Sequence, residues 1–378
     1  MKPNIFSEIE SLNKVFVYSP GSEHNKVLPD DIKPYLEINN KIIKNDNFLL
    51  FDDILDLNSA KNQHDAFRDI INFYKEDSCV DLREYFQNIM TEFNINSEFP
   101  LINLLYPRDI AVTIGNQILL TKSSSNVRSK ENVITKEFFN NHPELRGTEI
   151  IDFEKIGNGL SLEGGDVFVI NKDIIMIGIS ERTSIEAINL LIPHLFEQTF
   201  KYVIAIDLPK KRAMMHLDTI FTQIDHNEGI LFDNHQYNIK NLSVYMASKN
   251  DSKNMQLKKQ NFTFENLFKE IGLDFKMIMC GGTEPNFQLR EQLTDGANSF
   301  VLEPGKIIMY DCNQKTISEL EKNGYKHITS KMFYYNLLTF EKVLNNEDKV
   351  VISINGSELV KGRGGPRCMT LPISRGLL

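Results

Sequence analysis

A strand, a turn and a second strand recur along this chain, and this repeat constrains the fold more than any other feature of the sequence. β-Branched residues fill the strands, and Gly-Asn, Asn-Lys-Asp or Pro-Gly marks three of the turns, as is typical of β-hairpins. One of the repeats has a longer turn. We expect hairpins at AVTIGNQILLTK (111–122), DVFVINKDIIMIGI (166–179), TIFTQIDHNEGILF (219–232) and SFVLEPGKIIMYD (299–311).

Helical patterns accompany these hairpins. Residues 183–199 begin with a capping box, Thr183 to Glu186, and continue with apolar residues at helical spacing. Residues 59–74 form a second amphipathic pattern. Hairpin-plus-helix units that recur every ~50 to 80 residues predict blades around an axis, as in a propeller. A plain α+β sandwich is the alternative that the period leaves open.

Polar side chains stand at equivalent places in three of these repeats. Asp109 precedes the first hairpin, Glu163 and Asp166 the second, and His216 and Asp218 the third. At strand spacing, His216 and Asp218 point to the same face. A single carboxylate at a strand entry is usually a turn-former. Because strands around a common axis would bring the whole set together, we interpret it as a candidate catalytic site.

Two glycine-rich segments flank these residues. SLEGGDVFVI (161–170) permits close backbone approach, as a ligand floor requires, although an acidic turn is the alternative. KGRGGPRCMTLP (361–372) leads through an irregular loop to Cys368. Backbone N–H groups and a nearby arginine could lower the pKa of this thiol. A lone cysteine is most often a small buried hydrophobe, but with His216 it would supply a nucleophile and a proton carrier.

Arginines near these motifs indicate a carboxylate on the ligand, since the guanidinium fork suits carboxylates. For each one separately, a surface salt bridge is the alternative. Carboxylates at one end and arginines at the other would suit a zwitterion with a cationic tail. The arginines concerned are Arg128, Arg182, Arg363 and Arg367.

Composition excludes several other classes of function. The net charge of −9 argues against nucleic acid as a partner. No apolar run has the length of a signal peptide or a membrane span, so we expect no membrane association. The four cysteines lack CxxC spacing, which argues against a zinc site and a disulfide framework and favours the cytoplasm.

Together, these segments resemble the arginine deiminases, guanidino-modifying enzymes of the pentein fold. The similarity keeps the family's order across nearly the whole chain, and HLDT with the terminal GRGGPRCM is its most specific part. The matching segments are NLLYPRD (103–109), LEGGDVFVI (162–170), ISERTS (179–184), MHLDTIFTQID (215–225), REQLTDGAN (290–298), LEPGKIIMYDCN (302–313) and NGSELVKGRGGPRCMTLPISR (355–375).

The resemblance implies one catalytic domain over residues 1–378, a five-bladed α/β propeller, that hydrolyses L-arginine to citrulline and ammonia. It makes Cys368 the nucleophile, His216 the general acid/base and Glu163 the residue that orients His216. Asp109 and Asp218 would grip the guanidinium, with Tyr106 beside the aliphatic stem. The amino-acid end would be held or covered by Asn103, Arg128, Arg182 and Arg363. A covalent S-alkylthiouronium intermediate is implied, with no metal and no organic cofactor.

The chain departs from the family pattern in three places. YPRDI stands where the family has FTRDP, which changes the pocket around the substrate stem. Only residues 81–99 are available for the helical bundle that the family inserts there, so we expect a short helical insertion. The family's oligomeric state therefore does not carry over to this chain, and a homodimer is one assembly that the sequence leaves open. Cys312 occupies a position where a basic residue is common, and we expect it to be structural.

Two alternatives compete with the deiminase interpretation. One is a related guanidino hydrolase or amidinotransferase with another substrate, such as agmatine or a methylated arginine. Three arginines at the amino-acid end favour an α-amino acid over agmatine, which has no carboxylate. The other is a non-catalytic propeller that binds arginine, although a binding module needs no nucleophile.

Overall fold

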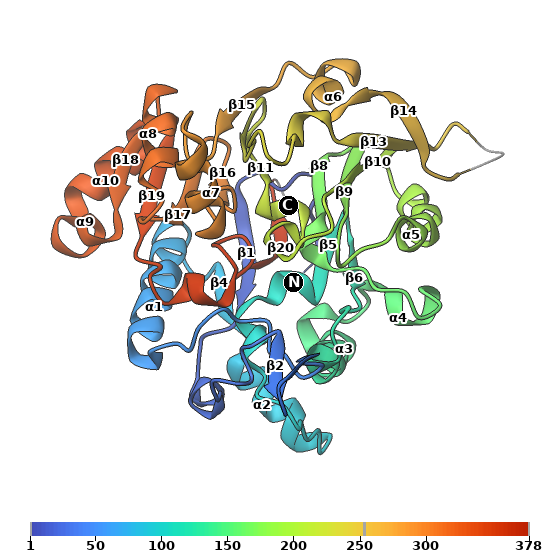
Figure 1. Ribbon diagram of the computed structural model, residues 1–378. Helices are drawn as coiled ribbons and strands as arrows, with labels where there is room; N and C mark the ends of the chain where they lie inside the picture. The colour runs from blue at the N-terminus through green and yellow to red at the C-terminus, as the bar shows by residue number, and fades with distance from the viewer. Residues whose placement is uncertain (1, 252–254, 377–378) are drawn as a thin grey trace.

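The computed structural model of the protein describes residues 2–251 and 255–376. Five β-sheets stand around a common axis (Figure 1). Each contains the same unit, an antiparallel strand pair of which one member also pairs in parallel with a third strand. This repeated unit confirms the predicted α/β propeller with five blades.

All of the predicted hairpins form the inner part of a blade. The first blade is β5 (Ala111–Ile114), β6 (Gln117–Leu120) and β7 (Glu149–Asp152). The next is β8 (Val167–Asn171), β9 (Ile174–Ile179) and β10 (Tyr202–Asp207), extended by β13 (Ser243–Ser248) and β14 (Lys258–Thr263). The third blade contains β11 (Phe221–Asp225), β12 (Glu228–Leu231) and β15 (Lys276–Met279). The fourth contains β16 (Phe300–Glu303), β17 (Lys306–Tyr310), β19 (Val350–Ile354) and β18 (Lys326–Thr329).

The fifth blade joins distant parts of the chain. Strand β1 (Leu12–Val17) pairs antiparallel with β20 (Leu371–Arg375) and in parallel with β4 (Cys79–Asp81). In Figure 1, β1 in blue and β20 in red lie side by side near the axis. This blade closes the ring and was not predicted, because no turn connects its two inner strands.

Most helices lie outside the ring of sheets (Figure 1). Residues 81–99 contain one helix, α2, so the segment predicted as an insertion forms only a short element. The predicted helix at 59–74 is α1, which begins at Leu57. The helices are α1 (Leu57–Tyr74), α2 (Arg83–Glu92), α3 (Ser129–Asn141), α4 (Phe153–Ile156), α5 (Ile185–Glu197), α6 (Phe264–Glu270), α7 (Pro285–Leu293), α8 (Gln314–Lys322), α9 (Ser330–Tyr335) and α10 (Leu337–Asn346).

The predicted cap of α5 is wrong by one residue. Ser184 caps the helix, accepting a hydrogen bond from the N–H of Ala187, so the pair Thr183 and Glu186 does not form the capping box. The Thr183 hydroxyl oxygen instead accepts the N–H of Glu163 at 3.1 Å. The segment after β9 thereby fixes Glu163, which precedes β8 of the same blade.

Short 3₁₀ turns carry the polar residues at the strand entries. They span Pro107–Asp109, Gly164–Asp166 and Leu217–Thr219, immediately before β5, β8 and β11, and pack against one another near the axis. His216 and Asp218 therefore do not alternate along a strand, as their spacing suggested: one precedes a turn and the other lies within it. The Thr219 hydroxyl, which donates to the His216 carbonyl at 2.7 Å, stabilises this turn.

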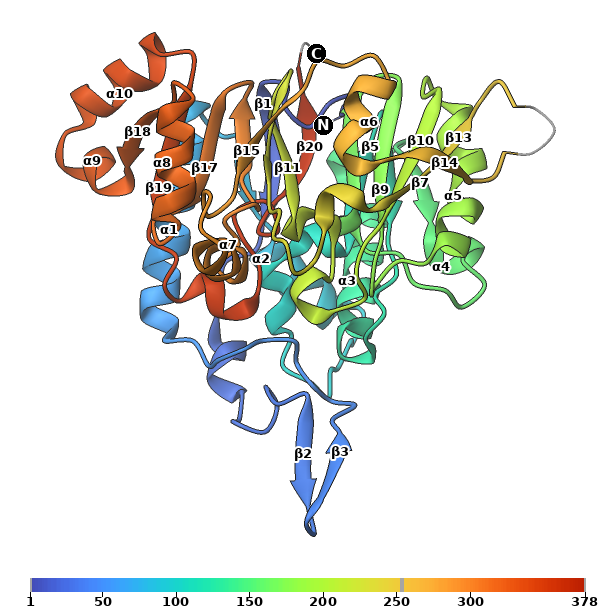
Figure 2. The same cartoon turned by 45° about the horizontal axis from the view of Figure 1, so that its top comes forward.

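One element extends away from the propeller. The hairpin of β2 (Tyr35–Ile38) and β3 (Lys41–Lys44) projects from the body and is followed by a segment that returns to the axis (Figure 2). Within residues 2–251 and 255–376, no helix combines the length and apolar character that crossing a bilayer requires.

Candidate active site

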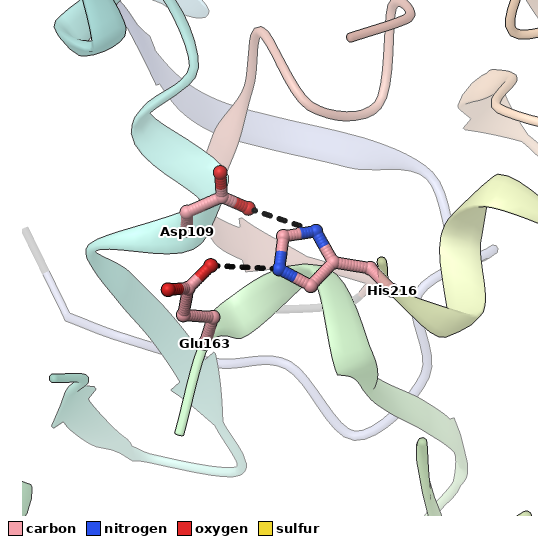
Figure 3. Close-up of side chains that lie close together, drawn as sticks. All are labelled: Asp109, Glu163 and His216. Carbon is pink, nitrogen blue, oxygen red and sulfur yellow. Dashed lines mark hydrogen bonds and ion pairs between the residues drawn. The ribbon is translucent and has the colours of Figure 1, made fainter. Parts of the chain in front are cut away.

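His216 lies between two carboxylates that come from different blades (Figure 3). Its Nε2 atom is 2.8 Å from Glu163 Oε2, and its Nδ1 atom is 3.6 Å from Asp109 Oδ1. All three side chains are buried. The convergence predicted from the repeats thus brings an imidazole and two carboxylates together at the axis.

Glu163 is held by donors on its other oxygen. Oε1 accepts hydrogen bonds from the Ser123 hydroxyl at 3.0 Å and from the Ser124 N–H and hydroxyl at 2.7 and 3.0 Å. Arg182 Nη1 is 3.8 Å away. Burial alone would raise the pKa of Glu163, but the Arg182 charge and the hydrogen bond with His216 hold it well below its ordinary value. Glu163 is therefore a permanent anion beside the imidazole.

The two carboxylates keep His216 protonated. Burial disfavours the imidazolium, but the charge of Asp109 and the hydrogen bond to Glu163 outweigh it and raise the pKa of His216 to about 10. Gly165 makes room for the ring, since a Cβ there would lie 2.5 Å from His216 Nδ1. The glycine pair thus provides the close backbone approach that the sequence suggested. At neutral pH His216 can donate a proton.

Cys368 lies at the other side of the same pocket. Its thiol donates to Asp218 Oδ2 at 3.4 Å and accepts from Asn298 Nδ2 at 3.1 Å. The backbone N–H of Cys368 also donates to Asn298 Oδ1 at 3.2 Å. Burial and the charges of Asp218 and Asp109 raise the pKa of the thiol well above its ordinary value. The sulfur is therefore a neutral thiol until a positive charge arrives next to it.

Asp218 is fixed from behind by a buried arginine. Arg367 Nη1 donates to Asp218 Oδ2 at 2.9 Å, and its other nitrogens donate to both oxygens of Glu8 at 2.9 to 3.1 Å. The guanidinium carbon lies 3.7 Å from the centre of the Phe168 ring. Arg367 thus orients the carboxylate that touches the thiol and is not free for a ligand.

Asp166, which the repeats placed with these groups, has a structural role. Its oxygens accept the Leu217 N–H at 2.9 Å and the Ser180 hydroxyl at 2.6 Å. The bond from Leu217 fixes the turn between His216 and Asp218, and the bond from Ser180 orients the Asp166 carboxylate. Asp166 therefore positions the site without facing it.

Each guanidinium nitrogen of Arg128 donates a hydrogen bond within the protein. Nη1 donates to Asp109 Oδ2 and Nε to Glu131 Oε2, both at 2.7 Å, while Nη2 donates to the carbonyls of Asn103 and Tyr106. The Asn103 amide in turn donates to the Leu49 carbonyl at 3.0 Å. Arg128 thus holds Asp109 in place, with four of its five N–H groups already used within the protein.

Tyr106 and Arg363 meet in the glycine-rich loop. The Tyr106 hydroxyl donates to the Leu359 carbonyl at 2.6 Å, and its ring fills the space where Gly362 and Gly364 have no side chains. Arg363 adopts a left-handed conformation (φ +62°), and its Nη1 donates to the Leu293 carbonyl at 2.8 Å. Tyr106 therefore packs on the loop that carries Arg363 and Cys368.

One pocket joins these groups. It holds about 20 Å³ of space, about enough for one water molecule. Asp218 lies behind the thiol and does not line it. The predicted residues that do are Asn103, Tyr106, Asp109, Arg128, Glu163, Arg182, His216, Arg363 and Cys368.

The sequence did not reveal several residues that build the site. Asn298 contacts the thiol, although its amide does not titrate and so did not mark it as a candidate. The only sequence feature that pointed to it was its place in the family-like segment REQLTDGAN. Glu8 and Glu131, which fix Arg367 and Arg128, belong to no motif.

The cluster around His216 also has the composition of a metal site. Ligand-type atoms of Asp109, Glu163 and His216 lie within 4.8 Å of one another. However, Arg128 and Arg182 already place positive charges 2.7 and 3.8 Å from the two carboxylates. The electrostatics of this cluster therefore favour a proton on His216 over a divalent cation.

Known proteins share this chain's sequence and fold. A family model described as arginine deiminase matches residues 81–375. The arginine deiminase of Mycoplasma capricolum is 31% identical over 438 aligned positions, which cover 99% of this chain and 97% of the relative. That alignment is longer than the 378 residues of this chain, so the relative contains residues that this chain lacks.

Solved structures of the pentein superfamily show the same fold at lower identity. One is the N-terminal domain of ArgZ, a cyanobacterial arginine dihydrolase bound to its product. It is 13% identical, with a TM-score of 0.59 over 97% of this chain and 98% of that chain. Another is a dimethylarginine dimethylaminohydrolase adduct with S-methyl-L-thiocitrulline, 17% identical with a TM-score of 0.55, over 96% of this chain and 99% of that chain.

Proposed function

Because this chain belongs to the arginine deiminase family, we propose that it hydrolyses the guanidinium group of L-arginine to give L-citrulline and ammonia. The observation that carries the proposal is a pair of buried carboxylate oxygens, one on Asp109, which lines the pocket with Cys368, and one on Asp218, which contacts the thiol. Among the residues that the structure describes, Asp109 Oδ1 and Asp218 Oδ1 accept no hydrogen bond. Asp109 Oδ1 faces the His216 ring only at 3.6 Å and Asp218 Oδ1 has no donor among those residues, so a further cationic donor would stabilise both buried oxygens.

A guanidinium group meets this demand. It is planar, always positive and carries N–H donors in a fixed fork, so it can bond two carboxylates at once. Its charge next to Cys368 would favour the thiolate over the thiol. As the guanidinium binds, the thiol would release its proton to solvent, and the sulfur would take up a proton again when the product leaves.

The reaction then proceeds in two steps. The Cys368 thiolate adds to the guanidinium carbon, and the His216 imidazolium gives its proton to the departing nitrogen, which leaves as ammonia. The neutral imidazole next takes a proton from water, and the resulting hydroxide attacks the S-alkylthiouronium. When this adduct collapses, the C–S bond breaks, the sulfur is released and the ureido product forms. Glu163 keeps the ring oriented and balances its charge in both steps.

Product analysis of the purified protein with L-arginine tests this function. We expect citrulline and ammonia in equal amounts. A second equivalent of ammonia would instead indicate that the protein also hydrolyses its product. No turnover of arginine would contradict the proposal, and other guanidino compounds would then be compared as substrates.

Metal removal supplies a second test. Dialysis against EDTA is expected to leave kcat and KM for arginine unchanged, because arginine side chains and a proton on His216 already balance the carboxylates. Steady-state assays before and after dialysis measure this. A loss that added zinc or manganese restores would show that the Asp109, Glu163 and His216 cluster binds a metal.

We also propose that the protein works in the cytoplasm as a homodimer. All four cysteines are free thiols, as reducing compartments favour. A cluster of exposed apolar side chains at the junction of α9 and α10 offers a surface for self-association: Tyr334, Tyr335, Leu337 and Leu338. Sedimentation equilibrium should give twice the mass of one chain, and the mass of a single chain would reject the dimer.

A further inference from the structure

A second, much larger cleft opens beside the catalytic pocket. It holds about 850 Å³, and Leu50 and Arg182 line both spaces. Positive side chains outnumber negative ones on its walls: Lys44, Arg182, Lys210, Lys211 and Arg212 face Asp46 and Glu181. An anionic group therefore finds a favourable field here.

The two volumes indicate how an amino-acid substrate would lie, if the proposed function is correct. The catalytic pocket has space for little more than a water molecule, so even a guanidinium must displace its walls. The remainder of arginine must extend past Leu50 and Arg182, which separate the pocket from the cleft. Its α-carboxylate would then reach the positively charged wall.

Few arginine donors near this boundary are free. Arg128 has an acceptor for each of its nitrogens, and Arg363 Nη1 donates to the Leu293 carbonyl. In contrast, Arg182 Nε and Arg212 Nη1 are buried and have no hydrogen-bond acceptor among the described residues. In the part of the chain that the structure describes, Arg182 Nε forms one ion pair, with Glu181 Oε1 at 3.5 Å. Buried N–H groups without acceptors are costly, and together these two point to a missing anion.

Arg212 is firmly placed at this boundary. Its Nη2 donates to the Leu50 carbonyl at 2.8 Å and to Asp52 Oδ1 at 2.6 Å. Its guanidinium carbon lies 4.7 Å from the centre of the Phe48 ring. These contacts fix one side of the guanidinium and leave Nη1 without an acceptor. A donor that is already oriented loses little entropy when it binds a ligand.

We propose that Arg212 is a further substrate-binding residue, which donates Nη1–H to the α-carboxylate of the substrate next to Arg182. The carboxylate satisfies the two unpaired guanidinium donors, while Arg128 keeps its structural bonds to Asp109 and Glu131. Arg212 therefore distinguishes amino acids from guanidino compounds without a carboxylate.

Binding of two ligands to an inactive protein tests this assignment. Titration calorimetry in the Cys368→Ser background compares L-arginine with agmatine, which has the same guanidinium group and no carboxylate. Arg212→Gln should weaken the binding of arginine by about 10- to 100-fold, as expected for a lost charge-assisted hydrogen bond. The binding of agmatine should change by less than about twofold, since it makes no such bond.

Lys210→Gln is the matched control. It removes one positive charge from the same cleft, but Lys210 Nζ already donates to the carbonyls of Ile179 and Leu208 and to Asp207. We expect it to leave both affinities nearly unchanged. An equal loss for arginine in both variants would assign the effect to the general field and overturn the proposal.

A purely structural role of Arg212 would weaken arginine and agmatine alike, which also overturns the proposal. If Arg212→Gln does not fold, as judged by thermal melting, Arg212→Lys gives the same comparison, because lysine keeps the charge without the planar fork. Conversion of arginine by the unmodified protein tests the proposed function separately. A protein that turns over arginine but shows no selective loss in the variant would refute only the role of Arg212.

Discussion

Replacing Cys368 by serine is expected to lower kcat for arginine by at least about 10⁴-fold, because a serine hydroxyl is far less acidic than a thiol and is not ionised by the charge of the substrate. The thiol contacts Asp218 and Asn298, and no described hydrogen bond links it to His216. Activation of the sulfur therefore depends on the intrinsic acidity of a thiol and on the charge of the substrate. Single-turnover measurements with labelled arginine would detect even slow residual chemistry.

Cys312→Ser is the control for this substitution. Cys312 is partly exposed and takes no part in the site, so kcat and KM should change by less than about twofold. Acid-quenched wild-type protein should also carry a substrate-derived mass on the peptide that contains Cys368. Activity retained in Cys368→Ser, or an adduct on another cysteine, would refute the assigned nucleophile.

Replacing His216 by glycine is expected to reduce kcat by about 10²- to 10⁴-fold, the range for a lost general acid or base. The pKa of His216, raised to about 10, means that the acid form is present at neutral pH and is lost as the pH rises through that value. In the wild type kcat/KM should therefore fall on the alkaline side near pH 10. The variant should lack this decrease. A titration near pH 6.5 instead would show that Asp109 and Glu163 do not stabilise the imidazolium.

A substrate with a better leaving group separates the two proposed roles of His216. The methylthio group of S-methyl-L-thiocitrulline departs as a thiolate, so the first step does not require the imidazolium. The second step still requires a base to activate water. The glycine variant should therefore accumulate a Cys368 adduct with this compound, detectable by mass spectrometry. Turnover of this compound by the variant without an accumulating adduct would show that His216 does not activate the water in the second step.

The hairpins and most of the site could be predicted from the sequence because both are encoded locally. Each hairpin has its own turn residues, and each polar group lies at the start of a strand. Two local expectations were nevertheless wrong. Ser184 rather than Thr183 caps α5, because the Thr183 hydroxyl is occupied by the Glu163 N–H. The turn at 217–219 replaces the strand expected there, because Asp166 binds its backbone.

Pairings between distant residues could not be predicted. Glu8 and Arg367 are 359 positions apart, and neither residue alone indicates that the other will neutralise it in the interior. The same holds for Arg212, whose contacts with Leu50 and Asp52 arise only when the segment after the β2–β3 hairpin returns to the axis. Such residues are recognised from satisfied and unsatisfied hydrogen bonds, which a sequence does not display.

The pairing of β1 with β20 has a consequence during synthesis of the protein. Because β20 follows all the other strands, a nascent chain can fold four blades while β1 still lacks its antiparallel neighbour. At that stage Glu8 has no Arg367 to pair with, and Cys368, the proposed nucleophile, has not yet been translated or is still within the ribosome. A chain that stops before residue 368 would therefore have neither a closed ring nor a thiol at its axis. An incomplete chain therefore cannot hydrolyse arginine by the proposed reaction.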